Sequence, residues 1–289
     1  MSPRLRRLGG MDTGFPASDA QTDFSRARRE GALARLTARL RREPSDFDVI
    51  LPFEEVIGEL GWAGQRSIGL QSIALDSIVG TVDRSKEFDR RFRPTSGTVR
   101  GRWQRIAEAQ RRGRDMPPIS VYRVGDMHFV KDGHHRVSVA RAQRRTHIDA
   151  YVTEVQTKVG ADLAIRPADL PLKGHERLFG ERVPLPPEAR QRVRPSDPWD
   201  YGALAEGVEA WGLRAIQATG QLMSREEVAQ AWYRDDYLPV VNTLREAGLL
   251  AGRNETDVYM RVVSDRYRLM RTHEWSEQIL TQLRPTLRR

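Results

Sequence analysis

The sequence predicts an α+β fold in which a central mixed domain is preceded and followed by helical segments. Between residues 70 and 155, strand-like segments with alternating apolar positions are interleaved with two segments of helical periodicity. The expected order is strand, helix, hairpin, helix and strand, which is typical of a compact α+β unit. On either side of this stretch, apolar residues recur at helical spacing instead.

Local signals mark the elements of the central domain. Gly125 and Asp126 form a two-residue loop between two strand-like runs, and glycine accepts the positive φ that such a hairpin requires. Asp132 and Gly133 then turn the chain from a strand directly into a helix. The expected elements are a strand over 70–79, a helix capped within 95–98 and running to about 112, strands over 118–124 and 127–131, a helix over 134–143 and a strand over 148–155.

The flanking segments differ from the central domain in composition. A basic helix is expected from Asp23 to about Arg42, with Leu33, Leu36 and Leu40 on one side, and a short helix over 53–60. Seven of the sixteen prolines fall within residues 166–198, which indicates a linker. The predicted organisation is a disordered basic tail (1–22), a helical arm (23–65), an α+β domain (68–158), a proline-rich linker (159–198) and a helical domain (199–289) whose last helix is capped at Thr272.

The composition excludes several classes of protein. The chain has no cysteine, so disulfides, thiolate metal sites and a cysteine nucleophile are excluded. No run of 18 apolar residues is present, so no membrane span is expected. The basic N-terminus lacks an apolar segment of the secretory type, and these features together favour a cytoplasmic location.

The positive charge is clustered. The chain carries a net charge of +9; ten arginines against four acids give residues 1–42 a charge of +6, and eleven basic residues against three acids give residues 84–114 a charge of +8. Such clusters attract polyanions, although a solvated face with arginines paired to acids elsewhere explains the composition equally well. If the clusters bind a polyanion, the residues expected to contact DNA are Arg26, Arg28, Arg29, Arg100 and Arg105.

The most informative segment is Asp132-Gly133-His134-His135-Arg136, where a strand passes through a tight turn into a helix. The first N–H groups of a helix have no intrahelical partner, and the helix dipole makes that end partly positive. Two imidazoles and a guanidinium at the same place would suit a phosphate chain. The plainer alternative is an ordinary Asp-Gly turn followed by capping or surface histidines.

Adjacent histidines such as His134 and His135 point about 100° apart on a helix. No carboxylate follows them at helical spacing, so no dedicated metal site is expected.

Three segments carry a resemblance to a known superfamily. Residues 75–79, residues 116–122 (Met-Pro-Pro-Ile-Ser-Val-Tyr) and residues 131–136 (Lys-Asp-Gly-His-His-Arg) are similar to the opening strand, the Pro-Ile-x-Val strand and the second phosphate box of the ParB/sulfiredoxin superfamily. The chain resembles in particular the actinobacterial-type ParB-like proteins. The resemblance implies that Gly133, His134, His135 and Arg136 hold the phosphates of CTP or of ATP/ADP, with Mg²⁺. It also implies a phosphate-contacting arginine at Arg84 or, as the second choice, at Arg93.

Departures from the family pattern narrow the expected activity. Sulfiredoxin needs a cysteine where His134 stands, so its reaction is excluded. Partition proteins have Gly-Glu-Arg-Arg where this chain has Gly-His-His-Arg, and their DNA-reading helix-turn-helix is not evident here. Archaeal free-serine kinases on this fold carry an Asp-Gly-His turn closer to the one in this chain, together with a glutamate base.

Three functions follow from these observations. The favoured one is a ParB-like protein that binds a nucleotide at the turn and associates with DNA through its arginines, with nucleotide hydrolysis, nuclease action and homodimer formation left open. The alternative is a small-molecule kinase in which Glu87, or as the second choice Asp83, is the general base and Asp132 or His134 orients the phosphates. A solvated Glu87 paired with a nearby arginine is the plainer interpretation of that residue. The third is a non-catalytic regulatory module whose helical domain binds protein.

Overall fold

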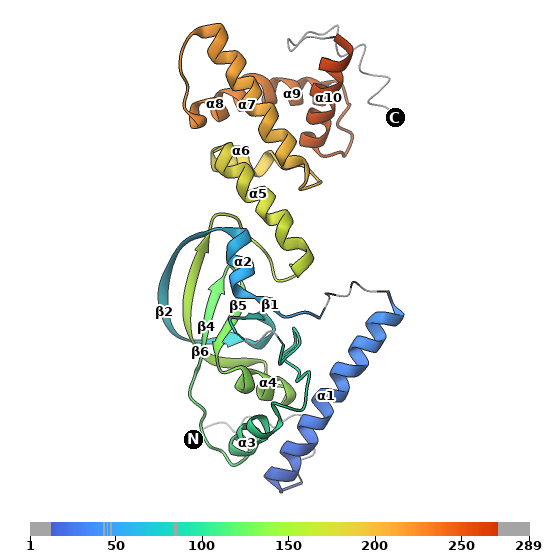
Figure 1. Ribbon diagram of the computed structural model, residues 1–289, viewed down its shortest axis with the longest axis vertical. Helices are drawn as coiled ribbons and strands as arrows, with labels where there is room; N and C mark the ends of the chain where they lie inside the picture. The colour runs from blue at the N-terminus through green and yellow to red at the C-terminus, as the bar shows by residue number, and fades with distance from the viewer. Residues whose placement is uncertain (1–12, 43, 45, 47, 84–85, 271–289) are drawn as a thin grey trace. The chain divides into compact units, whose positions relative to one another are not determined.

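The computed structural model describes residues 13–270, except residues 43, 45, 47, 84 and 85 (Figure 1). The chain divides into two compact units, residues 1–171 and residues 172–289. The first unit contains a six-stranded mixed sheet, and the second is helical in its described part. The general prediction of a mixed α+β chain is therefore confirmed.

The sheet of the first unit has the strand order β1-β3-β5-β4-β6-β2. Its centre is the hairpin of β4 and β5, which pair in antiparallel fashion through the expected turn at Gly125. The neighbours β3 and β6 are parallel to β5 and β4, respectively. The strand bounds are β1 Leu51–Pro52, β2 Trp62–Ala74, β3 Ile78–Thr81, β4 Ile119–Val124, β5 Met127–Asp132 and β6 His147–Thr157.

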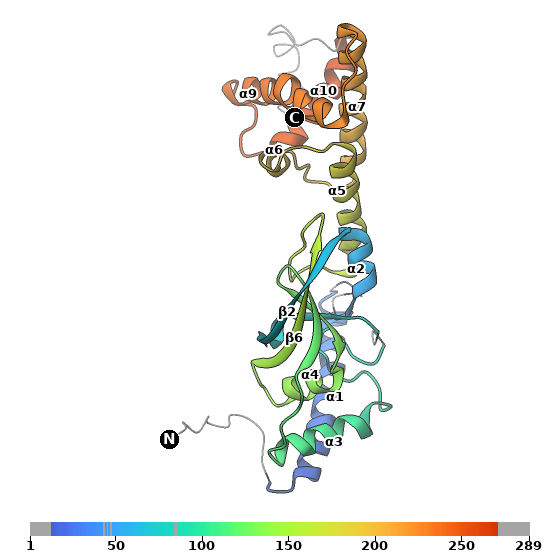
Figure 2. The same cartoon turned by 90° about the vertical axis from the view of Figure 1, so that its left-hand side faces the viewer.

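Helices cover both faces of this sheet. Neighbouring residues of a strand point to opposite faces, so Val130 of β5 packs with one apolar core and Phe129 with the other. The first core includes residues of α1 (Pro16–Leu40), α3 (Arg100–Arg111) and α4 (His134–Ala142), which lie side by side in Figures 1 and 2. The second core includes the apolar residues of α2 (Phe53–Leu60).

The N-terminal boundaries differ from the prediction. Helix α1 begins at Pro16, so residues 16–22 are helical; residues 1–12 of the expected tail lie outside the described part. Proline at the first helical position is favourable, and the side chain of Asp19 accepts hydrogen bonds from the N–H (3.1 Å) and hydroxyl (2.7 Å) groups of Thr13. Ala20 and Phe24 are buried in the first core, which stabilises this turn through packing that the local composition does not reveal.

Two further segments are corrected. The expected arm over 23–65 is not one unit, because α2 packs on the sheet and β2 begins at Trp62. The expected strand over 70–79 is two strands, since β2 ends at Ala74 and β3 begins at Ile78 after a 3₁₀ turn over Leu75–Ser77. The hydroxyl of Ser77 donates to the carbonyl of Ala74 (2.7 Å) and closes this turn.

The proline-rich segment contains the boundary between the two units, at residues 171 and 172, but much of it is helical and not an extended linker. It contains α5 (Leu170–Arg182) and α6 (Pro187–Arg192). Phe179, Val183 and Ala189 belong to the apolar core of the second unit, together with residues of the later helices. Pro171 and Pro187 stand in the first turns of these two helices, where the missing N–H costs nothing.

The second unit continues with α7 (Asp200–Thr219), α8 (Arg225–Trp232), α9 (Leu238–Glu246) and α10 (Glu255–Met270). A π-helical turn over Tyr233–Tyr237 joins α8 to α9 without a break, and Pro239 follows it. Proline removes a backbone donor from a helix interior, and a wider turn is a known way to accommodate that loss. The helix expected from Thr272 lies outside the described residues, and within them no helix is long and apolar enough to cross a membrane.

Candidate anion-binding sites

The turn after β5 has the conformation that the sequence predicts. Gly133 has a φ of +104°, and α4 begins at His134. A Cβ atom at position 133 would lie 2.4 Å from Cγ2 of Ile119, so both the backbone conformation and the packing require glycine. The strand, tight turn and helix N-terminus are therefore arranged as expected.

The two imidazoles of the turn point into the protein. His134 and His135 are 5% and 6% exposed. Nε2 of His134 lies 2.7 Å from the hydroxyl oxygen of Thr81, at the end of β3. Phe88 stacks over His134 (ring centroids 6.5 Å apart) and meets His135 edge-on (5.4 Å). These contacts explain why the histidines are core groups, and they show that the loop around Phe88 lies over the turn.

The guanidinium of Arg136 is bound by neighbouring residues of the first unit. Its guanidinium donates to the backbone carbonyls of Pro117 (2.5 Å) and Pro118 (2.9 Å) and forms an ion pair with the carboxylate of Asp132. The Arg136 side chain is 12% exposed, whereas that of Asp132 is 66% exposed. Arg136 therefore links the turn to the segment before β4. A phosphate would have to replace the Asp132 carboxylate as the ionic partner of Arg136.

These residues line a small surface hollow of about 30 Å³. Asp132, Gly133, His134, His135 and Arg136 form one side, so the structure does bring the predicted turn residues together around a shared space. Arg102 and Ile106 of α3 line the rest. No local sequence pattern reveals this contribution, because only the packing of α3 against α4 brings Arg102 to the turn. The volume holds about one or two water molecules, so a phosphate chain needs the hollow to widen.

Among the described candidates, Glu87 and Arg93 do not line this hollow. Glu87 is half-buried and its backbone carbonyl accepts from the N–H of Thr95 (3.1 Å). The second-choice arginine, Arg93, forms ion pairs with Asp48 (2.8 Å) and Asp89 (2.7 Å). Burial and the charge of Asp89 raise the pKa of the Asp48 carboxyl. The first-choice arginine, Arg84, lies outside the described residues.

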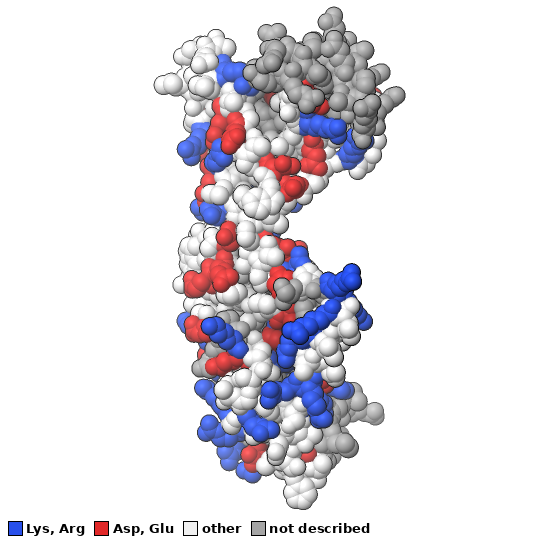
Figure 3. Space-filling view, turned by 45° about the vertical axis from the view of Figure 1, so that its right-hand side comes forward, with Lys and Arg blue, Asp and Glu red and all other residues white. Residues whose placement is uncertain are grey.

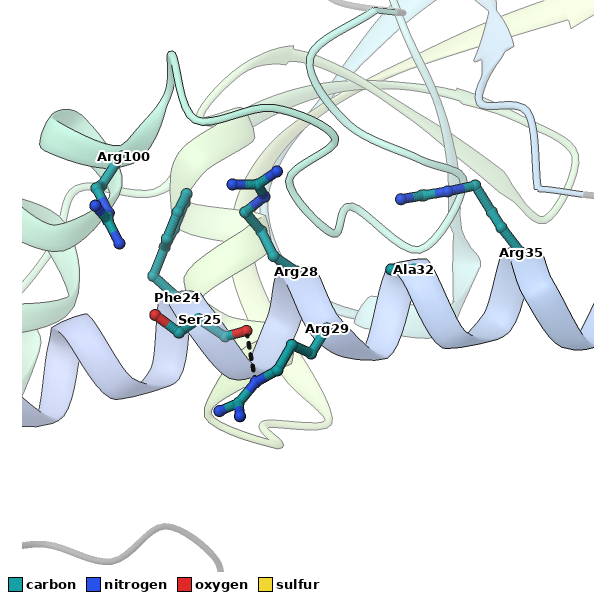
Figure 4. Close-up of a pocket in the computed structure, with 7 residues that line it drawn as sticks. All are labelled: Phe24, Ser25, Arg28, Arg29, Ala32, Arg35 and Arg100. Carbon is teal, nitrogen blue, oxygen red and sulfur yellow. Dashed lines mark hydrogen bonds between the residues drawn. The ribbon is translucent and has the colours of Figure 1, made fainter.

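A larger groove lies between α1 and α3. Its volume is about 300 Å³, and it is lined by Arg28, Arg29 and Arg35 of α1 and by Arg100 of α3 (Figure 4). Phe24 lies at its base, with the Arg100 guanidinium 5.5 Å from its ring centroid. Among the described residues that line the groove, none is acidic.

The groove contains three of the five arginines expected to contact DNA. In Figure 4, Arg28 and Arg35 extend from the side of α1 that carries Phe24, whereas Arg29 folds back so that its Nε donates to the carbonyl of Ser25 (3.3 Å). Arg26 instead forms an ion pair with buried Asp23 (2.6 Å), and Arg105 does not line the groove. Arg35 was missed, although its seven-residue spacing from Arg28 places the two on the same side of a helix.

Buried polar contacts hold the two walls of the groove together. Asp23 of α1 is 3% exposed and accepts a hydrogen bond from Arg111 of α3 at 2.5 Å. Indole Nε1 of Trp103 donates to the hydroxyl of Ser138 (2.8 Å), which joins α3 to α4. Figure 3 shows lysine and arginine side chains gathered over the lower part of the molecule, where α1 and α3 lie. The groove and the turn thus share α3 as a common wall.

A scan against protein-family models, a search of curated proteins and a search of solved structures each found no match.

Proposed function

We propose that this chain is a ParB-like protein that associates with DNA through the arginine groove and binds a nucleotide's phosphates at the turn after β5. The groove carries this proposal. Four arginines from two helices line a space of about 300 Å³, and none of its lining residues that the structure describes is acidic. Phosphate oxygens are the ligands that guanidiniums bind most favourably, and a row of them releases counterions on binding.

The ParB/sulfiredoxin-type fold is part of the same proposal. The arrangement of β4, β5, the Gly133 turn and α4 supports it, because the family places its second phosphate box at such a turn. Within the described residues no group of three or more potential metal ligands occurs, so Mg²⁺ would arrive with the phosphates. Nucleotide binding requires Arg136 to exchange Asp132 for phosphate and the hollow to widen.

DNA association is tested by the salt dependence of binding to a labelled duplex, measured by fluorescence anisotropy. Replacing Arg28, Arg29, Arg35 and Arg100 by alanine should lower the slope of log K against log salt by about 3 to 4, at roughly 0.9 for each lost phosphate contact. The control replaces Arg182, Arg225, Arg234 and Arg253 of the second unit, which removes the same charge elsewhere. Equal weakening by both variants would show a general attraction to the basic chain and would overturn the proposal.

Nucleotide binding is tested separately by thermal shift with CTP, ATP, ADP and GTP in the presence of Mg²⁺. A ligand that binds only the folded chain raises its apparent stability by mass action. Arg102→Ala should reduce this shift, because Arg102 is exposed and lines the hollow. Arg114→Ala, which removes an exposed arginine beyond the end of α3, is the control. No shift with any of the four nucleotides would refute this half of the proposal and leave DNA association standing.

A further inference from the structure

Helix α1 carries an apolar stripe on its solvent side. Leu33, Leu36 and Leu40 are 62%, 55% and 78% exposed. Residues two positions apart on a helix point about 200° apart. Gly31 and Ala38, which are buried, therefore face the first unit, and the three leucines face away from it. The leucines expected to form the apolar side of the basic helix are thus not the residues that dock it.

The spacing of these leucines is that of a helix-pairing seam. Positions i, i+3 and i+7 fall within about 60° of one another around a helix. An apolar stripe this narrow is typical of the a and d positions of a coiled coil, whereas a helix that lies in a membrane interface presents a broad apolar face. The width of the stripe favours another helix as its partner.

The positive charge around the stripe indicates that the partner helix is acidic. Residues 26–42 contain seven arginines and one acid, Glu30, a net charge of +6. Pairing with a second copy of this chain would bring two such segments together, which like-charge repulsion opposes. Arg29 continues the stripe one turn before Leu33, and Arg39 flanks it beside Leu36; both are exposed, and neither forms an ion pair with another described residue. Acidic side chains would complement both arginines.

We propose that the solvent face of α1 docks an acidic amphipathic helix of another protein, with apolar residues against Leu33, Leu36 and Leu40 and carboxylates against Arg29 and Arg39. This inference goes beyond the proposed function and does not depend on it. The leucines lie on the side of α1 that points away from the first unit, whereas Arg28 and Arg35 extend from the side that carries Phe24. Arg29 lines the groove and also adjoins the stripe, so the leucines and Arg39 are the part of the docking surface that the groove does not share.

The probe is a synthetic 14-residue peptide with leucine at its a and d positions and glutamate at its e and g positions, titrated into the full chain by calorimetry. The repeated glutamates oppose pairing of the peptide with itself. Replacing Leu33, Leu36 and Leu40 by serine should weaken binding at least tenfold. The matched control replaces Leu213 and Leu222 by serine, two leucines of the second unit that are 58% and 92% exposed, and should bind as the original chain does.

A charge exchange tests the second half of the proposal. Arg29→Glu with Arg39→Glu should lose affinity for the glutamate peptide and gain affinity for the same peptide with lysine at e and g. The three leucines and the two arginines that are replaced in these experiments are all exposed, so the variants should keep the helical circular dichroism of the original chain. Equal binding of the glutamate peptide to the serine variant and the original chain, or no binding to either, would overturn the proposal.

Two other outcomes would overturn the proposal by identifying a different partner for the leucine stripe. A dimer in light scattering that the leucine substitutions abolish would show that a second copy covers the stripe. Leucine-dependent flotation with phosphatidylglycerol vesicles would show that a lipid surface covers it.

Discussion

Nε2 of His134 and the hydroxyl oxygen of Thr81 lie 2.7 Å apart in a buried contact that joins the first turn of α4 to the last residue of β3. The two residues are 53 positions apart in the sequence. Either group can be the donor, depending on the imidazole tautomer. The hydrogen bond fixes the orientation of the His134 ring below Phe88 and Phe92, and so makes this histidine part of the framework of the turn.

Thr81→Val should therefore destabilise the first unit although it preserves shape. Valine removes the hydroxyl and leaves a buried imidazole nitrogen without this bond, at a cost of about 1–3 kcal/mol in the free energy of unfolding. Chemical denaturation followed by circular dichroism measures the change. Thr81→Ser, which keeps the hydroxyl and removes only the methyl group, should be more stable than the valine variant. A valine variant as stable as the original chain would show that the hydrogen bond contributes nothing to stability.

Gly133→Ala should be destabilising for two separable reasons. A non-glycine residue at positive φ costs about 1–2 kcal/mol, and the contact with Ile119 adds about 1–3 kcal/mol of overpacking. Gly113 provides the control, because its φ of +75° is also positive but no atom lies within 4 Å of an added Cβ. The midpoint of denaturation should fall further for Gly133→Ala than for Gly113→Ala, and equal shifts would show that the turn can relax around a methyl group.

The parts of the fold that follow local rules were predicted from the sequence. The hairpin at Gly125, the turn at Gly133, helix α4 and helix α2 all depend on spacing, glycine conformation and apolar periodicity, which the sequence displays directly. The short strand β1 was missed, because two residues provide no periodicity to detect.

Tertiary packing decided the remaining features. Ala20, Phe24, Ala27, Gly31 and Ala38 dock α1, whereas Leu33, Leu36 and Leu40, which form the more obvious apolar pattern in the sequence, stay exposed. The segment with seven prolines folds as helices, because Phe179 and Val183 complete a core whose other members lie far along the chain. The burial of His134 and His135 depends on Phe88, whose position no local pattern reveals.

Asp23→Asn should loosen the wall of the arginine groove. Its carboxylate is 3% exposed and lies between Arg26 (2.6 Å) and Arg111 (2.5 Å). Asparagine removes the charge that pairs with both arginines, although Arg111 keeps its longer contact with Asp19 (3.6 Å). The expected loss in the free energy of unfolding is about 1.5–3 kcal/mol. Glu108→Gln serves as the control, since its pair with the 55% exposed Arg112 should contribute less than about 1 kcal/mol. Protease cleavage within α1 should accelerate in the Asp23 variant alone, and similar cleavage rates in both variants would separate helix docking from this ion pair.

His128 of β5 is a buried group whose charge the fold opposes. The hydroxyl of Ser77 donates to the carbonyl of Ala74 (2.7 Å), so its oxygen accepts from Nδ1–H of His128 (2.9 Å). Nε2 is buried and has no hydrogen-bond partner among the described residues. Protonation would place a second N–H in that space; burial, reinforced by the charge of Arg123, lowers the pKa of His128 to about 4.

The stability of the first unit should therefore fall as the pH falls from about 6.5 to about 4. In the unfolded chain His128 takes up a proton near pH 6.5, whereas the folded chain resists it until about pH 4, so the stabilisation is complete above pH 6.5 and is lost below that value. The shift corresponds to about 3 kcal/mol. His128→Asn should remove this part of the pH dependence in denaturation curves recorded across the interval, because asparagine does not titrate. His147→Asn, which replaces an exposed histidine of β6, should retain it, and identical pH profiles for the His128 variant and the original chain would contradict the assignment.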